Sequence, residues 1–357
     1  MKWVTIVGAR PQFVKAAVVS RCMRQAGDME EVLVHTGQHF DPMMSEVFFE
    51  EMRIPEPAEN LEVHALSQAA MTGRMLEKIE SVLLRERPDG VLVYGDTNST
   101  LAGALAAKKL HLTLAHVEAG LRSFNREMPE EINRIVTDRI ADWLFCPTEK
   151  AVEQLAKEGI AGPQVVCCGD VMQDAALFYA PMARQPEGFD ATLPFVLCTV
   201  HRAETTDNPQ RLRSVFAALE RISETCEVVL PLHPRTRKAL ENIAYDFSAS
   251  RLHWMEPVGY LEMVWLLQRC EMVLTDSGGL QKEAYFFRRP CVTLRDETEW
   301  VELVENGYNL LAGTESERIL TTFRAMREHP LSFAQAALYG QGDAGAKIVE
   351  VLRTIKK

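Results

Sequence analysis

Short apolar runs alternate with longer amphipathic segments along the chain. In the first half, the apolar runs lie at 3–8, 31–37, 90–96 and 112–120. They are continuous rather than alternately apolar and polar, which is typical of strands covered on both faces. In the segments between them, apolar residues recur at helical spacing. One such segment has on a single helical face Met75, Ile79, Val82 and Leu83. This order of strands and helices predicts parallel βαβ units.

A looser stretch at 179–194, with three prolines and little periodicity, is typical of a linker. The alternation restarts after it, with apolar runs at 195–200, 227–234, 271–279 and 290–294. We therefore predict two doubly wound α/β domains, over 1–178 and 195–357, with room for the last helix to pack back on the first domain. Ligands bind at the carboxyl ends of strands in such sheets and at domain interfaces, so we expect the ligand in a cleft between the domains.

Length and composition agree with two ordinary globular domains. The chain has 357 residues, more than the about 250–300 at which single cores usually split. Hydrophobic residues make up 47% and charged residues 25%. No apolar stretch reaches the ~18 residues of a membrane span, and we expect no signal peptide. The net charge of −11 argues against nucleic acid or an anionic membrane as a partner, but leaves room for a local cationic pocket.

The eight cysteines include no CxxC pair and no Cys/His spacing suited to zinc. We therefore expect reduced, buried thiols in a cytoplasmic protein, and no metal site.

Candidate phosphate-binding groups follow the first predicted strand. Gly8 is followed by Arg10 and Lys15 at the start of a helix. Two cations beside a helix N-terminus suit a phosphate group. The segment is neither GxGxxG nor a P-loop, so a dinucleotide fingerprint is absent. A solvated strand–helix turn stays an alternative.

Acidic residues end two further strands. Asp96 lies in the segment GDTNST, and Glu118 lies in HVEAGLR beside a glycine turn. Both are candidates for acid–base chemistry. The alternatives are that Asp96 is only a turn or helix N-cap residue and that Glu118 forms only a structural ion pair.

The helix that begins at Pro129 is a third candidate. Proline at its first position and acids in its first turn are typical of a helix start. Helical spacing places Glu130, Asn133, Arg134 and Thr137 on one face, opposite a face made of Ile132, Ile135 and Val136. An ordinary amphipathic helix is the alternative.

The second half of the chain has two comparable motifs. His201 and Arg202 end a strand, and histidine titrates nearest neutral pH. At the end of another strand, the chain enters a helix through Ser277, Gly278 and Gly279, with Glu283 one turn later. Backbone N–H groups and a hydroxyl converge on an anion at such a turn, so it resembles a nucleotide-diphosphate cradle. Glu283 could accept hydrogen bonds from a ribose.

Taken in order, these motifs resemble those of one enzyme family. The series GxRPxxxK, TGQH, GDTNST, HVEAGLR, PEExNR, HRxE, TDSGGxQxE and LRDxTE is similar to that of the non-hydrolysing UDP-N-acetylglucosamine 2-epimerases. The resemblance covers essentially the whole chain, and the ordered set is specific although each motif alone is weak. It implies two Rossmann-like domains in a glycosyltransferase-B-type arrangement, with the active site in the interdomain cleft.

The resemblance also implies residue roles. The positions that match the family's catalytic residues are Asp96, Glu118, Glu130 and His201. Arg10 and Lys15 would face the sugar-diphosphate, Ser277–Gly279 would hold the diphosphate, and Glu283 would bind the ribose. Further substrate-binding positions are His39, Arg134 and Arg202.

Several motifs depart from the usual family pattern. GTRPE reads GARPQ at 8–12, HRRE reads HRAE at 201–204, and TERPE reads TEWVE at 298–302, which removes an arginine near the nucleotide. Segments 36–52 and 231–237 look more like a branch that acts on modified UDP-2-acetamido sugars, such as UDP-2,3-diacetamido-2,3-dideoxyglucuronate.

The implied reaction is reversible epimerisation at carbon 2, by elimination and re-addition of UDP through a 2-acetamidoglycal, without a cofactor. The implied partners are a UDP-2-acetamido sugar, UDP and a second copy in a homodimer. Three alternatives stay open: a UDP-sugar glycosyltransferase of the same architecture, a hydrolysing epimerase, and a catalytically silent UDP-sugar-binding regulator.

Overall fold

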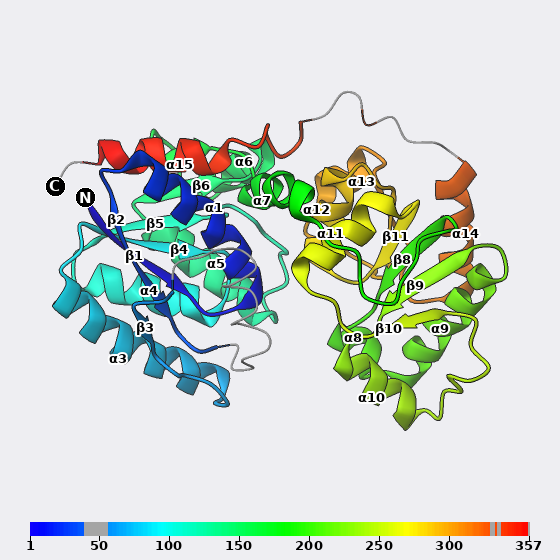
Figure 1. The fold of residues 1–357 in the computed structure, drawn as a ribbon. Coiled ribbons are helices and arrows are strands. Elements are labelled where there is room, and N and C mark those ends of the chain that lie inside the picture. Colours follow the sequence, from blue (N-terminus) through cyan, green and yellow to red (C-terminus); the bar gives the residue numbers. More distant parts are fainter. Residues whose placement is uncertain (39–55, 329–332, 334–336, 356–357) are drawn as a thin grey trace. The chain divides into compact units, whose positions relative to one another are not determined.

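The computed structural model describes residues 1–38, 56–328, 333 and 337–355. The chain forms two compact units, each with its own parallel sheet and helices (Figure 1). Unit 1 comprises Met1–Ala175 and Ala337–Lys357, and unit 2 comprises Ala176–Ala336. The sequence-based limits at 178 and 195, and the linker between them, stay a prediction.

Unit 1 is built on a parallel sheet with the strand order β3-β2-β1-β4-β5-β6-β7. Its strands are β1 (Lys2–Val7), β2 (Glu30–His35), β3 (Glu59–Asn60), β4 (Gly90–Tyr94), β5 (Thr113–Val117), β6 (Trp143–Cys146) and β7 (Val165–Cys167). Its helices are α1 (Arg10–Ala26), α3 (Gln68–Glu86), α4 (Asn98–Lys109), α5 (Pro129–Ile140), α6 (Glu149–Lys157) and α15 (Ala344–Thr354), and α7 (Val171–Tyr179) crosses its limit.

Apolar side chains cover both faces of this sheet, as the continuous apolar runs predict. Val4 and Ile6 of β1 pack in one cluster with Met75 and Ile79 of α3. Trp3, Thr5 and Val7, which alternate with them along β1, are also fully buried. Strands buried on both faces are typical of parallel sheets that carry helices on each side.

The C-terminal helix α15 packs on α1 within unit 1 (Figure 1). Its first turn is held by α7, because the backbone N–H of Gly345 donates to Asp174 Oδ2 over 2.8 Å. Nearby, the N–H of Asp170 donates to the carbonyl oxygen of Tyr339 over 2.8 Å. These bonds anchor the returning chain end to the segment just before the Ala175 limit of unit 1.

Unit 2 has a second parallel sheet with the strand order β10-β9-β8-β11-β12-β13. Its strands are β8 (Phe195–Thr199), β9 (Glu227–Pro231), β10 (His253–Met255), β11 (Met272–Thr275), β12 (Cys291–Thr293) and β13 (Asn309–Leu311). Its helices are η1 (Ala180–Met182), α8 (Ala203–Thr206), α9 (Pro209–Ser223), α10 (Pro234–Asn242), α11 (Tyr260–Arg269), α12 (Gly278–Phe286), α13 (Val301–Glu305) and α14 (Ser316–Glu328).

Helix α9 illustrates how the sequence pattern becomes packing. Its apolar residues at helical spacing, Leu212, Val215, Phe216, Leu219 and Ile222, are all buried in one core cluster. Asn208 caps its first turn by accepting hydrogen bonds from the backbone N–H groups of Gln210 and Arg211. The helix therefore begins where the polar cap stands and buries the face that the periodicity predicts.

The strand orders create one switch point in each sheet. β1 lies between β2 and β4 in unit 1, and β8 lies between β9 and β11 in unit 2. The chain leaves neighbouring strands toward opposite sides at such a point, so the loops diverge and leave space for a ligand. The predicted α/β class with two Rossmann-like domains is confirmed. None of the helices described is long and apolar enough to cross a membrane.

Candidate active site

The first part of the site in unit 1 is an ion pair between α1 and the end of β5. Lys15 Nζ contacts Glu118 Oε2, and about one tenth of each side chain is exposed. Glu118 has φ +73°, a left-handed conformation that costs energy for a residue with a Cβ and is common at functional sites. Arg122 pairs instead with Asp138 and Glu158.

Gly95 allows this ion pair to approach the neighbouring turn. It has φ +61°, and a Cβ there would lie 3.2 Å from both Glu118 Oε2 and Lys15 Nζ. A side chain at this position would press on the two charged groups, so glycine suits both the conformation and the space.

Gln12 joins the two turns at the switch point of unit 1. Its Oε1 accepts hydrogen bonds from the backbone N–H groups of Gly8 at 2.8 Å and Ala9 at 3.1 Å. Its Nε2 donates to the carbonyl oxygen of Tyr94 at 2.7 Å and to Thr100 Oγ1 at 3.0 Å. The glutamine of GARPQ thus uses both ends of its amide, and a carboxylate could not donate the second pair of bonds.

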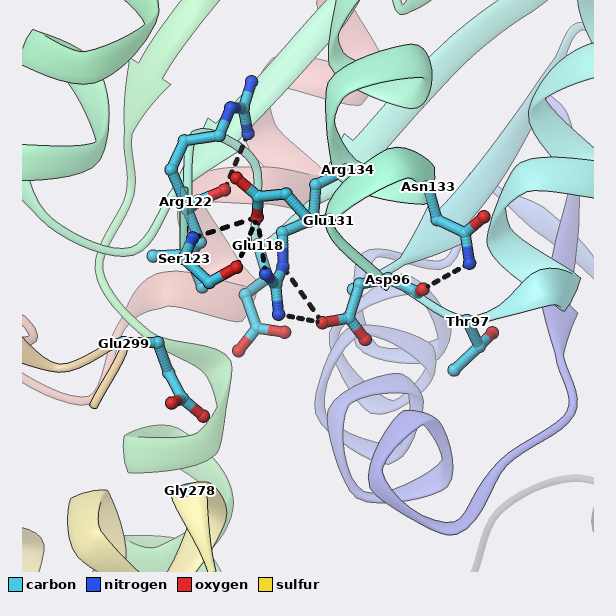
Figure 2. A network of polar contacts seen from close by, with 12 residues as sticks. Asp96, Thr97, Glu118, Arg122, Ser123, Glu131, Asn133, Arg134, Gly278 and Glu299 are labelled. Atoms are coloured by element: carbon cyan, nitrogen blue, oxygen red, sulfur yellow. Dashed lines mark hydrogen bonds and ion pairs between the residues drawn. The ribbon is translucent and has the colours of Figure 1, made fainter. Parts of the chain in front are cut away.

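Asp96, the next candidate, is held by Arg134 (Figure 2). Arg134 donates to Asp96 Oδ2 from Nε at 3.0 Å and from Nη2 at 2.6 Å. Asn133 Nδ2 donates to the carbonyl oxygen of Asp96 at 2.8 Å. The N-cap of α4 is Thr97, not Asp96, so the side chain of Asp96 is not used as the cap.

Glu131 completes the network and was not among the candidates from sequence. It accepts hydrogen bonds from the backbone N–H of Ser123 at 2.9 Å and from Arg134 Nη1 at 2.8 Å (Figure 2). The backbone N–H of Phe124 also donates to it, at 2.9 Å. Burial alone would raise the pKa of Glu131, but these donors lower it below its ordinary value. The i, i+3 spacing from Glu131 to Arg134 was the available signal.

Arg134 is correspondingly fixed as a cation. Burial alone would lower its pKa, but Asp96 and Glu131 raise it above the ordinary value.

Helix α5 buries its polar face. Its buried residues are Glu131, Asn133, Arg134, Thr137 and Asp138. Ile132 on the predicted apolar face is 42% exposed, so the ordinary amphipathic alternative is wrong.

A cavity of about 210 Å³ lies at these strand ends within unit 1. Its lining includes three of the predicted side chains, Lys15, Asp96 and Glu130, and a group of amides, Gln12, Gln38, Gln68, Asn98 and Asn133. Such polar groups suit a ligand rich in hydroxyl and acetamido groups. The side chain of Arg10 and the whole of His39 lie outside the described residues.

In unit 2, Asp276 organises the motif that contains His201 and Arg202. Fully buried at the end of β11, it accepts hydrogen bonds at Oδ2 from the backbone N–H groups of both residues, each at 2.8 Å. His201 Nδ1 lies 3.3 Å from Asp276 Oδ1. Asp276 therefore orients this histidine, a role that the TDSGG motif does not reveal by itself.

The two glycines that begin α12 have different surroundings. Ser277 caps the helix by accepting from the N–H of Leu280. A Cβ at Gly278 would lie 2.2 Å from Glu299 Oε1, whereas at Gly279 the nearest atom would be Ser277 Oγ at 3.9 Å. Gly278 is thus closely packed, and Gly279 faces open space.

Trp300 stands where the family pattern has an arginine. Its Nε1 donates to the carbonyl oxygen of Gly278 at 2.8 Å, and Lys282 Nζ lies 4.0 Å from the centre of its ring. Trp300 therefore supports the turn through a hydrogen bond and contacts Lys282 through a cation–π interaction. Glu283 lies buried one turn into the same helix; burial, with Glu283 nearby, raises the pKa of Tyr260 well above its ordinary value.

Comparison with known proteins shows the family to which the chain belongs. The family model described as UDP-N-acetylglucosamine 2-epimerase matches residues 21–353. The chain belongs to this family. The resemblance drawn from the ordered motifs is thereby confirmed.

Relatives of this epimerase family match the chain over nearly its whole length. The UDP-2,3-diacetamido-2,3-dideoxy-D-glucuronate 2-epimerase of Pseudomonas aeruginosa is 54% identical, with 99% of each chain covered. The solved UDP-GlcNAc 2-epimerase of Methanocaldococcus jannaschii, in complex with UDP-GlcNAc and UDP, has a TM-score of 0.90 at 40% identity, with 99% of each chain covered. That of Neisseria meningitidis, bound to UDP-GlcNAc, has a TM-score of 0.89 at 30% identity, covering 99% of this chain and 100% of the other.

The network around Arg134 generates a stability prediction. Replacing Glu131 with Gln should lower the free energy of unfolding by about 1.5–3 kcal/mol, because Arg134 loses one of its two charged partners and keeps Asp96. The pKa of Glu131 is lowered in the folded protein from its ordinary 4.5. The stabilising effect is therefore complete above that value and disappears as pH falls through the lowered pKa.

Urea unfolding from pH 7 down to pH 3 measures this effect. The exposed neighbour Glu130, changed to Gln, is the matched control and should keep wild-type stability. A Glu131→Gln protein as stable as the wild type at pH 7 would contradict the assigned network.

Proposed function

We propose that this chain catalyses the reversible epimerisation of a UDP-2-acetamido sugar at carbon 2. The observation that carries the proposal is the set of carboxylates and cations, Lys15 with Glu118 and Arg134 with Asp96, at the strand ends of unit 1. Family membership supplies the reaction type, and these residues are of the kinds that it needs.

The reaction has to overcome the low acidity of the proton on carbon 2, because no carbonyl group is adjacent to it. Breaking the anomeric C–O bond removes this obstacle, since positive charge on carbon 1 acidifies the neighbouring C–H. UDP leaves with the bonding electron pair, a base takes the proton, and a 1,2-double bond forms. Protonation from the opposite face and return of UDP give the epimer.

The carboxylates of unit 1 are proposed to move the proton. Asp96 and Glu130 line the cavity, and Glu118 contacts Lys15 on its wall. Arg134 and Lys15 place positive charges beside Asp96 and Glu118. Carboxylates of this kind can accept a proton or stabilise positive charge on the ring. His201, oriented by Asp276, is proposed as a further acid–base group.

Unit 2 is proposed to bind UDP. The helix α12 begins at Gly278 with Ser277 as its cap, and its N-terminal N–H groups suit the diphosphate. Glu283 would accept from the ribose hydroxyls, while Arg10, Lys15 and Arg202 would offset the charge of the diphosphate. His39 and Arg134 would complete the substrate-binding set.

The preferred substrate is proposed to be a modified sugar, UDP-2,3-diacetamido-2,3-dideoxyglucuronate. The support is the 54% identity to the Pseudomonas aeruginosa enzyme of that name and the resemblance of segments 36–52 and 231–237 to the branch that acts on modified sugars. A cytoplasmic location and a homodimeric state, which the ordered motifs imply, are proposed as well.

A substrate panel in deuterium oxide tests the reaction. With UDP-2,3-diacetamido-2,3-dideoxyglucuronate and UDP-GlcNAc offered separately, the uronate should turn over faster, and its product should carry deuterium at carbon 2. Anion-exchange chromatography and NMR follow both. Free sugar as the main product would indicate a hydrolase, transfer to an added acceptor a glycosyltransferase, and no turnover of any sugar a binding protein; each would refute the proposal.

Glu118→Gln tests the acid–base assignment. It keeps shape and removes the negative charge, so kcat should fall by ~10²–10⁴-fold while UDP still binds. Glu62→Gln, at another residue of unit 1 with positive φ, controls for a general effect of such a change. Full turnover by the Glu118 variant would remove this residue from the mechanism.

Gly279→Val tests the UDP site. Its side chain would enter open space in the free protein, so thermal stability should change little while UDP affinity falls by about tenfold or more, roughly 1.4 kcal/mol. Gly73→Val is the matched control. Gly73 lies in a helix, as Gly279 does, and an added Cβ at Gly73 would have no atom within 4 Å. Equal UDP affinity in isothermal titration of both variants would exclude α12 as the diphosphate site.

A further inference from the structure

A buried histidine lies beneath the two turns that carry Asp96 and Glu118. His116 is on β5 and is fully buried, as is the side chain of Asp138 on α5. Its Nδ1 lies 2.7 Å from Asp138 Oδ1, and its Nε2 lies 2.7 Å from the carbonyl oxygen of Gly95. Both ring nitrogens therefore make short polar contacts.

Both partners of this ring are hydrogen-bond acceptors. A carbonyl oxygen only accepts, so Nε2 must carry a proton. An ionised carboxylate also only accepts, so Nδ1 must carry one too. A neutral ring would turn a lone pair toward one of these oxygens, unless Asp138 itself were protonated.

The surroundings of Asp138 keep it ionised. Its Oδ2 accepts from Arg122 Nη1 at 2.7 Å and from the N–H of Gly120 at 3.1 Å. Arg122 also donates from Nε and Nη2 to Glu158, both at 2.8 Å, and these bonds stabilise its positive charge. Burial alone would raise the pKa of Asp138, but His116 and Arg122 lower it below its ordinary value.

The other ionisable groups around the ring are consistent with a cation there. Cys146 on β6 is a neutral thiol, since burial and the nearby Asp138 raise its pKa. Glu158 at the end of α6 pairs with Arg122, and Lys15 of α1 pairs with Glu118. Asp138 is therefore the carboxylate that can balance a positive charge on the ring.

From this geometry we propose that His116 carries a proton on each ring nitrogen and positions the Gly95–Asp96 turn against the Glu118 turn. Gly95 receives the ring's hydrogen bond at its carbonyl oxygen and donates from its N–H to the carbonyl oxygen of Val117 at 2.9 Å. The two turns are thus tied through one residue and share one buried cation. The catalytic consequence rests on the proposed function, because it assumes that Asp96 and Glu118 act on the sugar.

His35 provides an internal contrast. It is also buried and ends β2 of the same sheet. Its Nδ1 either accepts from the N–H of Gly37 at 3.0 Å or donates to Asn60 Oδ1 at 3.1 Å, depending on the tautomer, and neither partner is a charged group. Burial lowers the pKa of His35, and the ring is neutral.

Nitrogen NMR of the wild-type protein tests the charge state without any activity assay. With histidine labelled by ¹⁵N and assigned through the backbone, His116 should have two protonated ring nitrogens at pH 7.5, with closely spaced resonances. His35 should have one protonated and one unprotonated nitrogen, with widely spaced resonances. A widely spaced pair for His116 would overturn the proposal whether or not the chain is an epimerase.

His116→Gln tests the positioning role. The amide keeps one donor but not the charge, so kcat should fall by about 10²-fold, as for small misplacements of catalytic groups, with UDP affinity within about twofold of wild type. The acidic limb of the kcat–pH profile should move to higher pH, because carboxylates that lose a buried cation ionise less readily.

His35→Gln is the matched control and should leave that limb in place. The contrary outcome is a His116→Gln protein that loses stability but keeps the wild-type kcat and the wild-type acidic limb. That result would show that His116 is only a structural residue and would overturn the positioning role. If no sugar is turned over at all, the proposed function fails, and the NMR measurement still decides the charge state.

Discussion

The buried guanidinium of Arg134 is the constraint on which the site in unit 1 depends. A buried charge is tolerated only when it is paired and hydrogen-bonded, because desolvation of an unpaired ion costs several kcal/mol. Arg134 meets this condition by joining Asp96 of the β4–α4 turn to Glu131 of its own helix. Glu131 in turn receives the backbone N–H groups of Ser123 and Phe124. One side chain thereby fixes α5, the turn after β4 and the loop after β5 relative to one another.

Buried carboxylates act in a related way at the carboxyl ends of strands in both sheets. A fully buried carboxylate accepts backbone N–H groups from a neighbouring loop: Asp138 from Gly120 in unit 1, and Asp276 from His201 and Arg202 in unit 2. Such carboxylates hold short turns in defined conformations, which backbone bonds within the turns cannot do alone. These turns cost free energy through backbone strain as well as through desolvation, as the positive φ of Glu118 indicates.

Much of this architecture could be predicted from the sequence. Continuous apolar runs indicated strands buried on both faces, and the spacing of Leu212, Phe216 and Leu219 indicated which face of α9 is buried. The eight ordered motifs indicated the family. Their glycines, acids and cations follow strands that the local sequence pattern already predicts, so their position at strand ends could be inferred without the structure. Lys15, Asp96 and Glu130 come together at one cavity because the carboxyl ends of parallel strands lie at one edge of a sheet.

Other features were decided only in three dimensions. Periodicity divided α5 correctly into a polar and an apolar face, but could not tell that the polar face is the buried one, since this depends on Asp96 arriving from β4. Glu131 and Asp276 read as ordinary helix-start and turn residues until their distant backbone donors are in place. The charge of His116 likewise requires Asp138 and the Gly95 carbonyl, each 21 or more residues away in sequence. The sequence by itself determined the strands, the helices and the family, because these follow from local patterns; partners and protonation states were decided by the tertiary structure, because hydrogen bonding and desolvation depend on what surrounds each group.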